Sequence, residues 1–399
     1  MALARGMFNN YNEGEEMKSS KTRLLAVLMV VAMLASIVLV PSVAAAETDT
    51  TGEKPGQTSD AEASSQYTAY LNSIADKSNA KDKIVINAID YKEAKGVTYG
   101  TDGLKSVLSK KLYNVLVNPI TGERVPTDCL VWSDNDKFQQ QGSVVYEITV
   151  PADGVYNMSF TYLPLKKTGG NEDKSDDKTS TTALEIAVFI DGQTLYAGLD
   201  GLKLPRKFIN SGATVDNVMG GIRVDTVGNQ LTPDQVQYEE FVTGFAVDPI
   251  GVIAEPYAIF LSKGTHTIEL ESVYEPFALA NITLEVPETT PSYEEYIAKN
   301  NAAGAANYTG AAIQLEGENA WLKSTNSLVS KADNGSCHVT PSSHVKTLLN
   351  YIGSTNWQAP GESIVWVVDV KESGYYKFGV NYKQSAIIDG MTYLPFLED

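Results

Sequence analysis

The sequence predicts an all-β protein with the architecture of a jelly-roll β-sandwich. Two observations carry this prediction. Short runs of β-branched and aromatic residues recur over most of the chain, and Gly, Asp, Asn and Pro residues separate them. Runs of this kind are typical of antiparallel strands. No long amphipathic helical pattern interrupts them, so a sandwich or jelly roll is the most economical class.

Most of the predicted strands lie in the middle of the chain. They are Val144–Val150, Tyr156–Leu163, Leu184–Ile190, Tyr257–Leu261, Thr267–Val273 and Ile282–Val286. Two short helices are expected outside them. One covers Tyr67–Asp76, where apolar residues have helical spacing. The other ends a linker at 287–300, where Ser292 and Glu295 have the spacing of a capping box.

An internal repeat relates the two halves of the chain. Val144–Tyr162 (VVYEITVPADGVYNMSFTY) aligns without gaps with Ile364–Tyr382 (IVWVVDVKESGYYKFGVNY), at an offset of 220 residues. Gly154 and Gly374 coincide in this alignment. Each is expected to adopt a positive φ in the tight connection between two strands. Because repeats mark domain borders, this alignment organises the chain.

The repeat divides the chain into five parts, of which the second sandwich is expected to be truncated. The parts are a leader with a signal peptide at 1–46, a polar tether and short helix at 47–81, a complete sandwich at 82–287, a linker with a short helix at 288–310, and the second copy at 311–399. The second copy stops before the residues that would match Leu184–Ile190. We therefore expect a fragment of a longer protein or a truncated gene product.

The leader has the parts of a secretory signal peptide. An apolar run at Leu24–Val40 follows basic residues that begin at Lys18, and three alanines at 44–46 precede Glu47. Translation is expected to start at Met17, because the preceding segment carries acidic residues that signal peptides avoid. The protein is then secreted or on the cell surface. An uncleaved anchor helix is the alternative, and it would be the protein's contact with a membrane.

Charge and residue usage exclude several classes of function. The chain carries 31 Lys and Arg against 49 Asp and Glu, a formal net charge of −18, which argues against nucleic-acid binding. No G-x-S-x-G or H-E-x-x-H motif is present, so the protein is expected to be no enzyme. His266 is expected to be structural rather than a catalytic base. Cys129 and Cys337 fall in different repeats, and both free thiols and one inter-domain disulfide fit an oxidising compartment.

Loop aromatics are the best ligand-binding candidates. A sugar ring stacks an apolar face on Trp or Tyr while polar side chains bind its hydroxyl groups. Trp132 lies in a loop with Asp134 and Asn135, and Trp357 lies in the similar loop of the second repeat. The alternative for both tryptophans is that they cover the end of a sandwich core.

A polar, turn-rich stretch contains two more candidates. Arg223 and Asn229 lie there among other hydrogen-bonding side chains. They either grip a ligand or make a long loop rigid.

Three short motifs resemble those of galactose-binding-like jelly rolls in carbohydrate-binding modules. They are I-x-A-x-D-Y at Ile86–Tyr91, V-P-x-x-G-x-Y-N at Val150–Asn157, and F-I-D-G at Phe189–Gly192. The stretch from Asp225 to Pro276 is similar to the tandem jelly-roll N-terminal region of large Gram-positive extracellular solute-binding proteins. These belong to carbohydrate ABC transporters.

The resemblance implies an exported, non-catalytic, carbohydrate-binding-like protein, the N-terminal part of a solute-binding protein for sugar uptake. Its partners would be a carbohydrate and, through a missing downstream domain, a transporter permease. Two alternatives stay open. One is a set of accessory domains of a truncated glycoside hydrolase or lyase. The other is a structural or adhesive cell-surface module.

The resemblance also implies where calcium would bind. In related sugar-binding jelly rolls, an E-x-E opening strand helps to hold a structural calcium. Glu316 and Glu318 match this pattern in the second repeat, with surface carboxylates as the alternative. The first repeat has Asn87 and Ile89 instead, so no metal is expected there.

Overall fold

The computed structural model describes residues 60–95, 108–117, 122–132, 142–165, 181–335, 339–359 and 361–383. The predicted signal peptide and the start at Met17 lie outside these residues. In the described part, no helix is long and apolar enough to cross a membrane. The described residues form two α-helices, α2 at Asp60–Ser73 and α3 at Tyr293–Ala302, with 3-10 turns η1 at Ala197–Leu199 and η2 at Ser354–Asn356.

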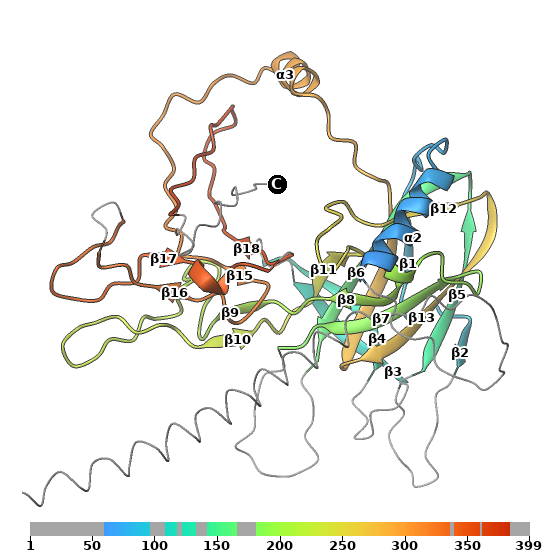
Figure 1. Cartoon of the computed structure of the whole chain (residues 1–399), viewed down its shortest axis with the longest axis horizontal. Helices are drawn as coiled ribbons and strands as arrows, with labels where there is room; N and C mark the ends of the chain where they lie inside the picture. The colour runs from blue at the N-terminus through green and yellow to red at the C-terminus, as the bar shows by residue number, and fades with distance from the viewer. Residues whose placement is uncertain are drawn as a thin grey trace, which may run out of the picture. The chain divides into compact units, whose positions relative to one another are not determined.

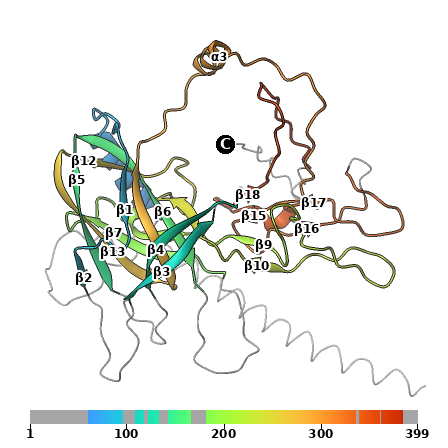
Figure 2. The same cartoon turned by 180° about the vertical axis from the view of Figure 1, so that it is seen from behind.

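Two antiparallel sheets form the jelly-roll β-sandwich that the sequence predicts (Figure 1). The first sheet has the order β11–β6–β14–β4–β3, with β1 also on β14 and β12 also on β6. Its strands are β1 (Ile84–Asn87), β3 (Leu108–Val117), β4 (Arg124–Trp132), β6 (Gly154–Pro164), β11 (Val242–Phe245), β12 (Ala258–Leu261) and β14 (Phe277–Glu285). Figure 2 shows the long β3–β4 pair from behind.

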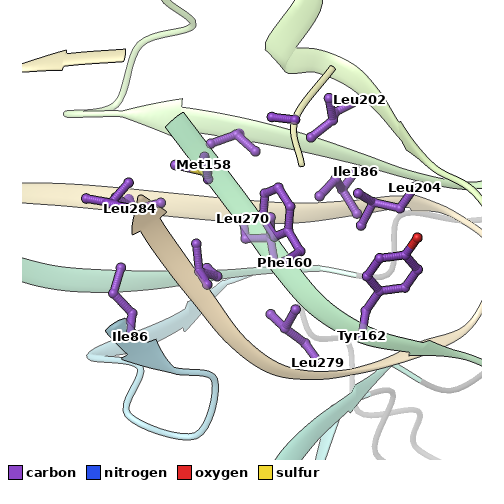
Figure 3. Close-up of a cluster of buried hydrophobic side chains, with 14 of the residues drawn as sticks. Ile86, Met158, Phe160, Tyr162, Ile186, Leu202, Leu204, Leu270, Leu279 and Leu284 are labelled. Carbon is purple, nitrogen blue, oxygen red and sulfur yellow. The ribbon is translucent and has the colours of Figure 1, made fainter. Parts of the chain in front are cut away.

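The second sheet has the order β2–β5–β13–β7–β8. Its strands are β2 (Glu93–Lys95), β5 (Ser143–Val150), β7 (Leu184–Ile190), β8 (Asp200–Leu204) and β13 (Gly264–Tyr274). The core lies between the two sheets, and Figure 3 shows side chains from both meeting there. Phe160 on β6 and Leu270 on β13 are fully buried in this core. Burying such side chains is the main contribution to the stability of the fold.

The strands with clear alternation were predicted well, and the central strand was not. β7 has the predicted bounds, whereas β14 begins at Phe277, five residues before the predicted start. The first four residues of β14 are all buried. Their outward side chains, Ala278 and Ala280, lie in a second apolar cluster with Val131 and Phe241. A strand that is covered on both faces loses the alternation by which strands are recognised.

The two equivalent glycines of the repeat have similar backbone surroundings. The reason for a glycine there differs from the one predicted. Neither Gly154 nor Gly374 has a positive φ. Instead, a Cβ at Gly154 would lie 2.7 Å from the Cα of Ala80, and one at Gly374 would lie 2.9 Å from the carbonyl oxygen of Ala306. At both places an upstream segment runs alongside the residue after the glycine, as parallel bridges Asn79–Val155 and Asn307–Tyr375. The glycine is therefore required for close backbone approach.

Helix α2 covers the outer edge of β12. The backbone N–H of Ala258 donates to the Tyr67 hydroxyl, and that of Phe260 donates to the Tyr70 hydroxyl, both at 2.8 Å. These bonds satisfy edge groups that would otherwise be open to another strand. The helix begins at Asp60, inside the segment predicted as tether. Helix α3 has the predicted capping box between Ser292 and Glu295.

A smaller sheet joins residues that the sequence assigned to different domains. Its order is β10–β9–β15–β18, with β9 at Phe208–Asn210, β10 at Gln235–Gln237, β15 at Leu322–Lys323 and β18 at Ile364–Val365. A further pair joins β16 (Ser330–Lys331) to β17 (Tyr351–Ile352). Strands β9 and β10 belong to the first predicted domain, and β9 pairs with β15 of the second copy. The domain boundaries at 82–287 and 311–399 stay predictions.

Candidate functional site

Trp132 is the last residue of β4, and its side chain is fully buried. Its ring stacks on Phe277, with centroids 4.7 Å apart and an interplanar angle of 13°. An indole without an exposed face cannot stack on a sugar, so in this structure Trp132 is a core residue. The apolar run Cys129–Trp132 was the signal for burial in the sequence. Its predicted neighbours Asp134 and Asn135 lie outside the described residues.

Trp357 is half-buried and directly follows η2. We call the described residues 353–359, 361 and 362 the Trp357 loop. Its indole N–H donates to the carbonyl oxygen of Glu362 at 3.2 Å. Gly353 has a φ of 103°, and a Cβ there would lie 3.3 Å from the ring carbon Cε3. The Glu362 carboxylate accepts the backbone N–H groups of Gln358 and Ala359, each at 3.0 Å. The ring is therefore held in place, and the residue is only partly buried.

Asn229 uses both ends of its side-chain amide within the protein. Its Nδ2 donates to Asp225 at 2.8 Å, and its Oδ1 accepts the backbone N–H of Thr347 at 2.8 Å. Hydrogen bonds from Asn229 and the neighbouring backbone lower the pKa of Asp225. Arg223 forms an exposed ion pair with Asp234 at 3.0 Å. This geometry makes the loop rigid, and ligand binding by Arg223 and Asn229 stays a prediction.

The two glutamates of the E-x-E pattern differ in environment. Glu316 accepts hydrogen bonds from Gln314 and Thr340. Glu318 is 5% exposed, and its Oε2 is buried with no partner among the described residues. Burial, together with the charge of Glu316, raises the pKa of Glu318.

This arrangement does not fit calcium as it stands. No three His, Cys, Asp or Glu side chains come together as a metal site in the described part of the chain. Calcium takes six to eight oxygen ligands, and two carboxylates of which one is biased toward protonation do not supply them. Calcium binding by Glu316 and Glu318 stays a prediction from the resemblance.

Ser262, His266 and Asp191 have the composition of a catalytic triad, but their hydrogen bonding is structural. The His266 Nδ1 lies 2.7 Å from the Asp191 Oδ2, and its Nε2 lies 2.8 Å from the Ser262 carbonyl oxygen. Both ring nitrogens face acceptors, so both carry protons in the satisfied state. A base must instead offer a lone pair to the Ser262 hydroxyl, which lies 3.4 Å away. His266 therefore joins the turn after β7 to the turn before β13.

The stabilising effect of His266 is expected to weaken as the pH rises through neutrality. Burial lowers the pKa of His266, but the hydrogen bonds to Asp191 and Ser262 outweigh this and raise it. A raised pKa means that the folded protein holds the proton more tightly than the unfolded chain. The contribution is complete below the unfolded pKa of about 6.5 and is lost as the pH rises through the folded pKa.

The measurement compares the melting temperatures of wild type and His266→Gln at pH 5.5 and pH 8.5. We expect a larger difference at pH 5.5, equivalent to about 1 kcal/mol or less, because Asp191 is half-exposed. His344→Gln is the matched control, since His344 lies exposed in a loop. A His266→Gln difference that does not change with pH would contradict the assignment.

Sequence reasoning missed a buried polar cluster around Asn210, on β9. The Lys323 ammonium and the Gln235 amide both donate to the Asn210 Oδ1 at 2.8 Å. Lys323 is 1% exposed, and burial lowers its pKa to about 8. Nothing in the sequence marks this lysine, because lysines are normally solvent-exposed and its acceptor is 113 residues away.

Comparisons with known proteins give distant structural similarity alone. No protein-family model and no curated protein matches the sequence. Solved structures with similarity include a mannanase with a family 35 carbohydrate-binding module from Podospora anserina, at 11% identity and a TM-score of 0.26. The match covers 53% of this chain and 29% of that one, so this chain spans under a third of that enzyme's length.

Two isolated family 6 carbohydrate-binding modules are also similar. The module of a Zobellia galactanivorans laminarinase has 12% identity and a TM-score of 0.24, and the match covers 51% of this chain and 99% of that one. The module of a Cellvibrio mixtus lichenase, solved with cellotriose, has 10% identity and a TM-score of 0.21, with coverages of 52% and 98%. Values this low do not transfer a ligand from one protein to another.

Proposed function

We propose that the chain is an exported, non-catalytic carbohydrate-binding protein that contacts sugar through the Trp357 loop. The observation that carries the proposal is the half-buried side chain of Trp357, whose indole N–H donates to the carbonyl oxygen of Glu362. A ring that is already fixed loses little conformational entropy when a sugar stacks on it. Backbone and side-chain groups around it, such as Gln358, are available to sugar hydroxyl groups.

Trp357→Ala is expected to weaken binding to a recognised polysaccharide about tenfold, or about 1.4 kcal/mol. The measurement is a glycan array followed by affinity gel electrophoresis on the polysaccharides that bind. Tyr293→Ala is the matched control, because Tyr293 is an aromatic residue that is 74% exposed on α3, outside the loop. Failure to bind any polysaccharide, or equal loss in both variants, would contradict the proposal.

We also propose a more specific role for the chain. The chain would be the N-terminal region of a solute-binding protein for sugar uptake, exported by its signal peptide and acting with a transporter permease. The resemblance of Asp225–Pro276 supports this assignment. The neighbouring genes test it: permease genes support the transporter role, whereas a hydrolase or lyase domain in the same reading frame supports the accessory-domain alternative.

One observation favours a second candidate, a structural or adhesive cell-surface module. The burial of Trp132 removes the predicted sugar platform from the first sandwich. With Trp132 in the core, the first sandwich could serve to bind protein rather than sugar. An array on which the full chain binds no glycan, while it adheres to a cell-wall protein fraction, would support this candidate against the first.

A further inference from the structure

A buried lysine on one strand of the small sheet donates to the carboxamide of an asparagine on the next strand. Lys323 is the last residue of β15 and Asn210 is the last residue of β9, and these strands are neighbours in the sheet (Figure 1). The two residues are 1% and 0% exposed. The Lys323 Nζ lies 2.8 Å from the Asn210 Oδ1. Lysines that are buried to this degree are normally paired with an opposite charge.

The Lys323 ammonium has no carboxylate partner among the described residues, and the Asn210 oxygen is its acceptor there. A buried charge without an opposite charge is costly, so the neutral amine is favoured. Burial accordingly lowers the pKa of Lys323 to about 8. At pH 7 about a tenth of this side chain is then the unprotonated amine, which is the form of lysine that acts as a nucleophile.

The Asn210 carboxamide is held with its carbonyl carbon within reach of that amine. Its Oδ1 accepts a second hydrogen bond from the Gln235 Nε2 at 2.8 Å. Its Nδ2 donates to the carbonyl oxygen of Val218 at 2.8 Å and lies 3.7 Å from the Met219 Sδ. The oxygen faces donors and the nitrogen faces acceptors, which fixes the orientation of the amide. Because a C=O bond is about 1.2 Å long, the Lys323 Nζ lies within about 4 Å of the Asn210 Cγ.

We propose that Lys323 and Asn210 react with each other to form an intramolecular isopeptide bond. The unprotonated Nζ attacks the Asn210 Cγ, so that the Nζ–Cγ bond forms and the Cγ–Nδ2 bond breaks. One proton passes from Nζ to Nδ2, which leaves as ammonia. The reaction needs no oxidant, reductant or other reactant. The Gln235 amide donates to the oxygen on which negative charge develops during the attack, and a donor in this place stabilises the tetrahedral intermediate.

The surroundings of the two groups favour the linked product. Reacting groups that are held in contact avoid the entropy cost of a bimolecular reaction. Both residues are closed to solvent, so water has little access to hydrolyse the new amide. The reaction also replaces a buried ammonium with a neutral amide. The bond joins the predicted domains at 82–287 and 311–399 covalently, and it does not depend on sugar binding.

Peptide mapping of the full chain by mass spectrometry tests the proposal directly. Trypsin does not cut after an acylated lysine, so the link joins the tryptic peptide 208–223, which contains Asn210, to the peptide 300–331, which contains Lys323. We expect this branched peptide in a reduced sample, with a mass lower than the sum of its two parts by one ammonia molecule. Fragmentation of the branched peptide should place the link at these two residues.

Lys323→Met and Asn210→Ala should each abolish the branched peptide completely. Lys207→Met is the matched control. Lys207 directly precedes β9 and burial also lowers its pKa, but its Nζ lies 3.4 Å from the hydroxyl oxygen of Ser363, which offers no carboxamide. This variant should keep the link in full, on a branched peptide that begins at residue 207 instead of 208.

A second measurement needs no change at either linked residue. A site for a sequence-specific protease is inserted after Thr290, in the exposed segment before α3. After cleavage, the two parts of this otherwise unchanged chain should run as one species on a reducing, denaturing gel. Three results would overturn the proposal. They are separation of the two parts, a wild-type map that contains only unlinked peptides, and loss of ammonia from Asn210 without a branched peptide.

Discussion

Replacing Arg206 with methionine is expected to lower the free energy of unfolding by about 3–5 kcal/mol. The Arg206 guanidinium lies 2.9 Å from the Glu275 carboxylate, and the two side chains are 0% and 1% exposed. Arg206 also donates to the carbonyl oxygens of Leu165 and Thr182 and to the Gln237 side chain. Methionine fills most of the volume but removes the Arg206 guanidinium from beside the buried Glu275 carboxylate.

Arg223→Met is the matched control for this change. Arg223 also forms an ion pair with a carboxylate, at 3.0 Å from Asp234, but the two side chains are 60% and 72% exposed. Exposed pairs of this kind contribute about 0–1 kcal/mol. Urea unfolding monitored by circular dichroism measures both variants. Equal destabilisation by the two changes would show that burial of the Arg206–Glu275 pair has no energetic consequence.

Replacing Trp132 with alanine is expected to destabilise the protein by about 3–5 kcal/mol, because it leaves a cavity beside Phe277. Trp357→Ala should cost about 1 kcal/mol or less, because Trp357 is only half-buried. The measurement is thermal unfolding of both variants, with affinity gel electrophoresis of the same samples. We expect Trp132 to affect stability and Trp357 to affect sugar binding.

The opposite pattern would reverse the assignment of the two tryptophans. If Trp132→Ala kept the wild-type melting temperature and lost sugar binding, Trp132 would be the sugar platform rather than a core residue. Trp132→Phe provides a milder variant that keeps an aromatic partner for Phe277. It should recover most of the stability lost in Trp132→Ala.

The predictable parts of the fold are those set by local pattern. The β7 bounds follow from an alternating apolar run between turn formers, and the start of α3 follows from the spacing of Ser292 and Glu295. The repeat places Gly154 and Gly374 at equivalent positions, but the positive φ predicted there was wrong, because the glycines are required by upstream segments that are distant in sequence. For β7 and α3 the physical cause lies within a few residues of its effect, so it is written in consecutive sequence.

The candidate site was less predictable, because burial depends on residues far away in the sequence. Trp132 and Trp357 look alike in sequence, yet one stacks on Phe277 in the core and the other is half-open in its loop. The Arg206–Glu275 pair joins residues 69 positions apart, and each looks like an ordinary surface charge in sequence. A local sequence pattern does not predict which charged side chains form an ion pair in the folded protein.

The sequence by itself determined the all-β class, the strand pair of the first copy and the kind of residues that fill its core, because alternation and turn chemistry are local properties. Tertiary structure alone decided which copy of that core is covered. Met158 and Phe378 occupy equivalent positions, but only Met158 has β14 beside it. The pattern states which side chains favour burial, and the pairing of distant strands decides whether they are buried.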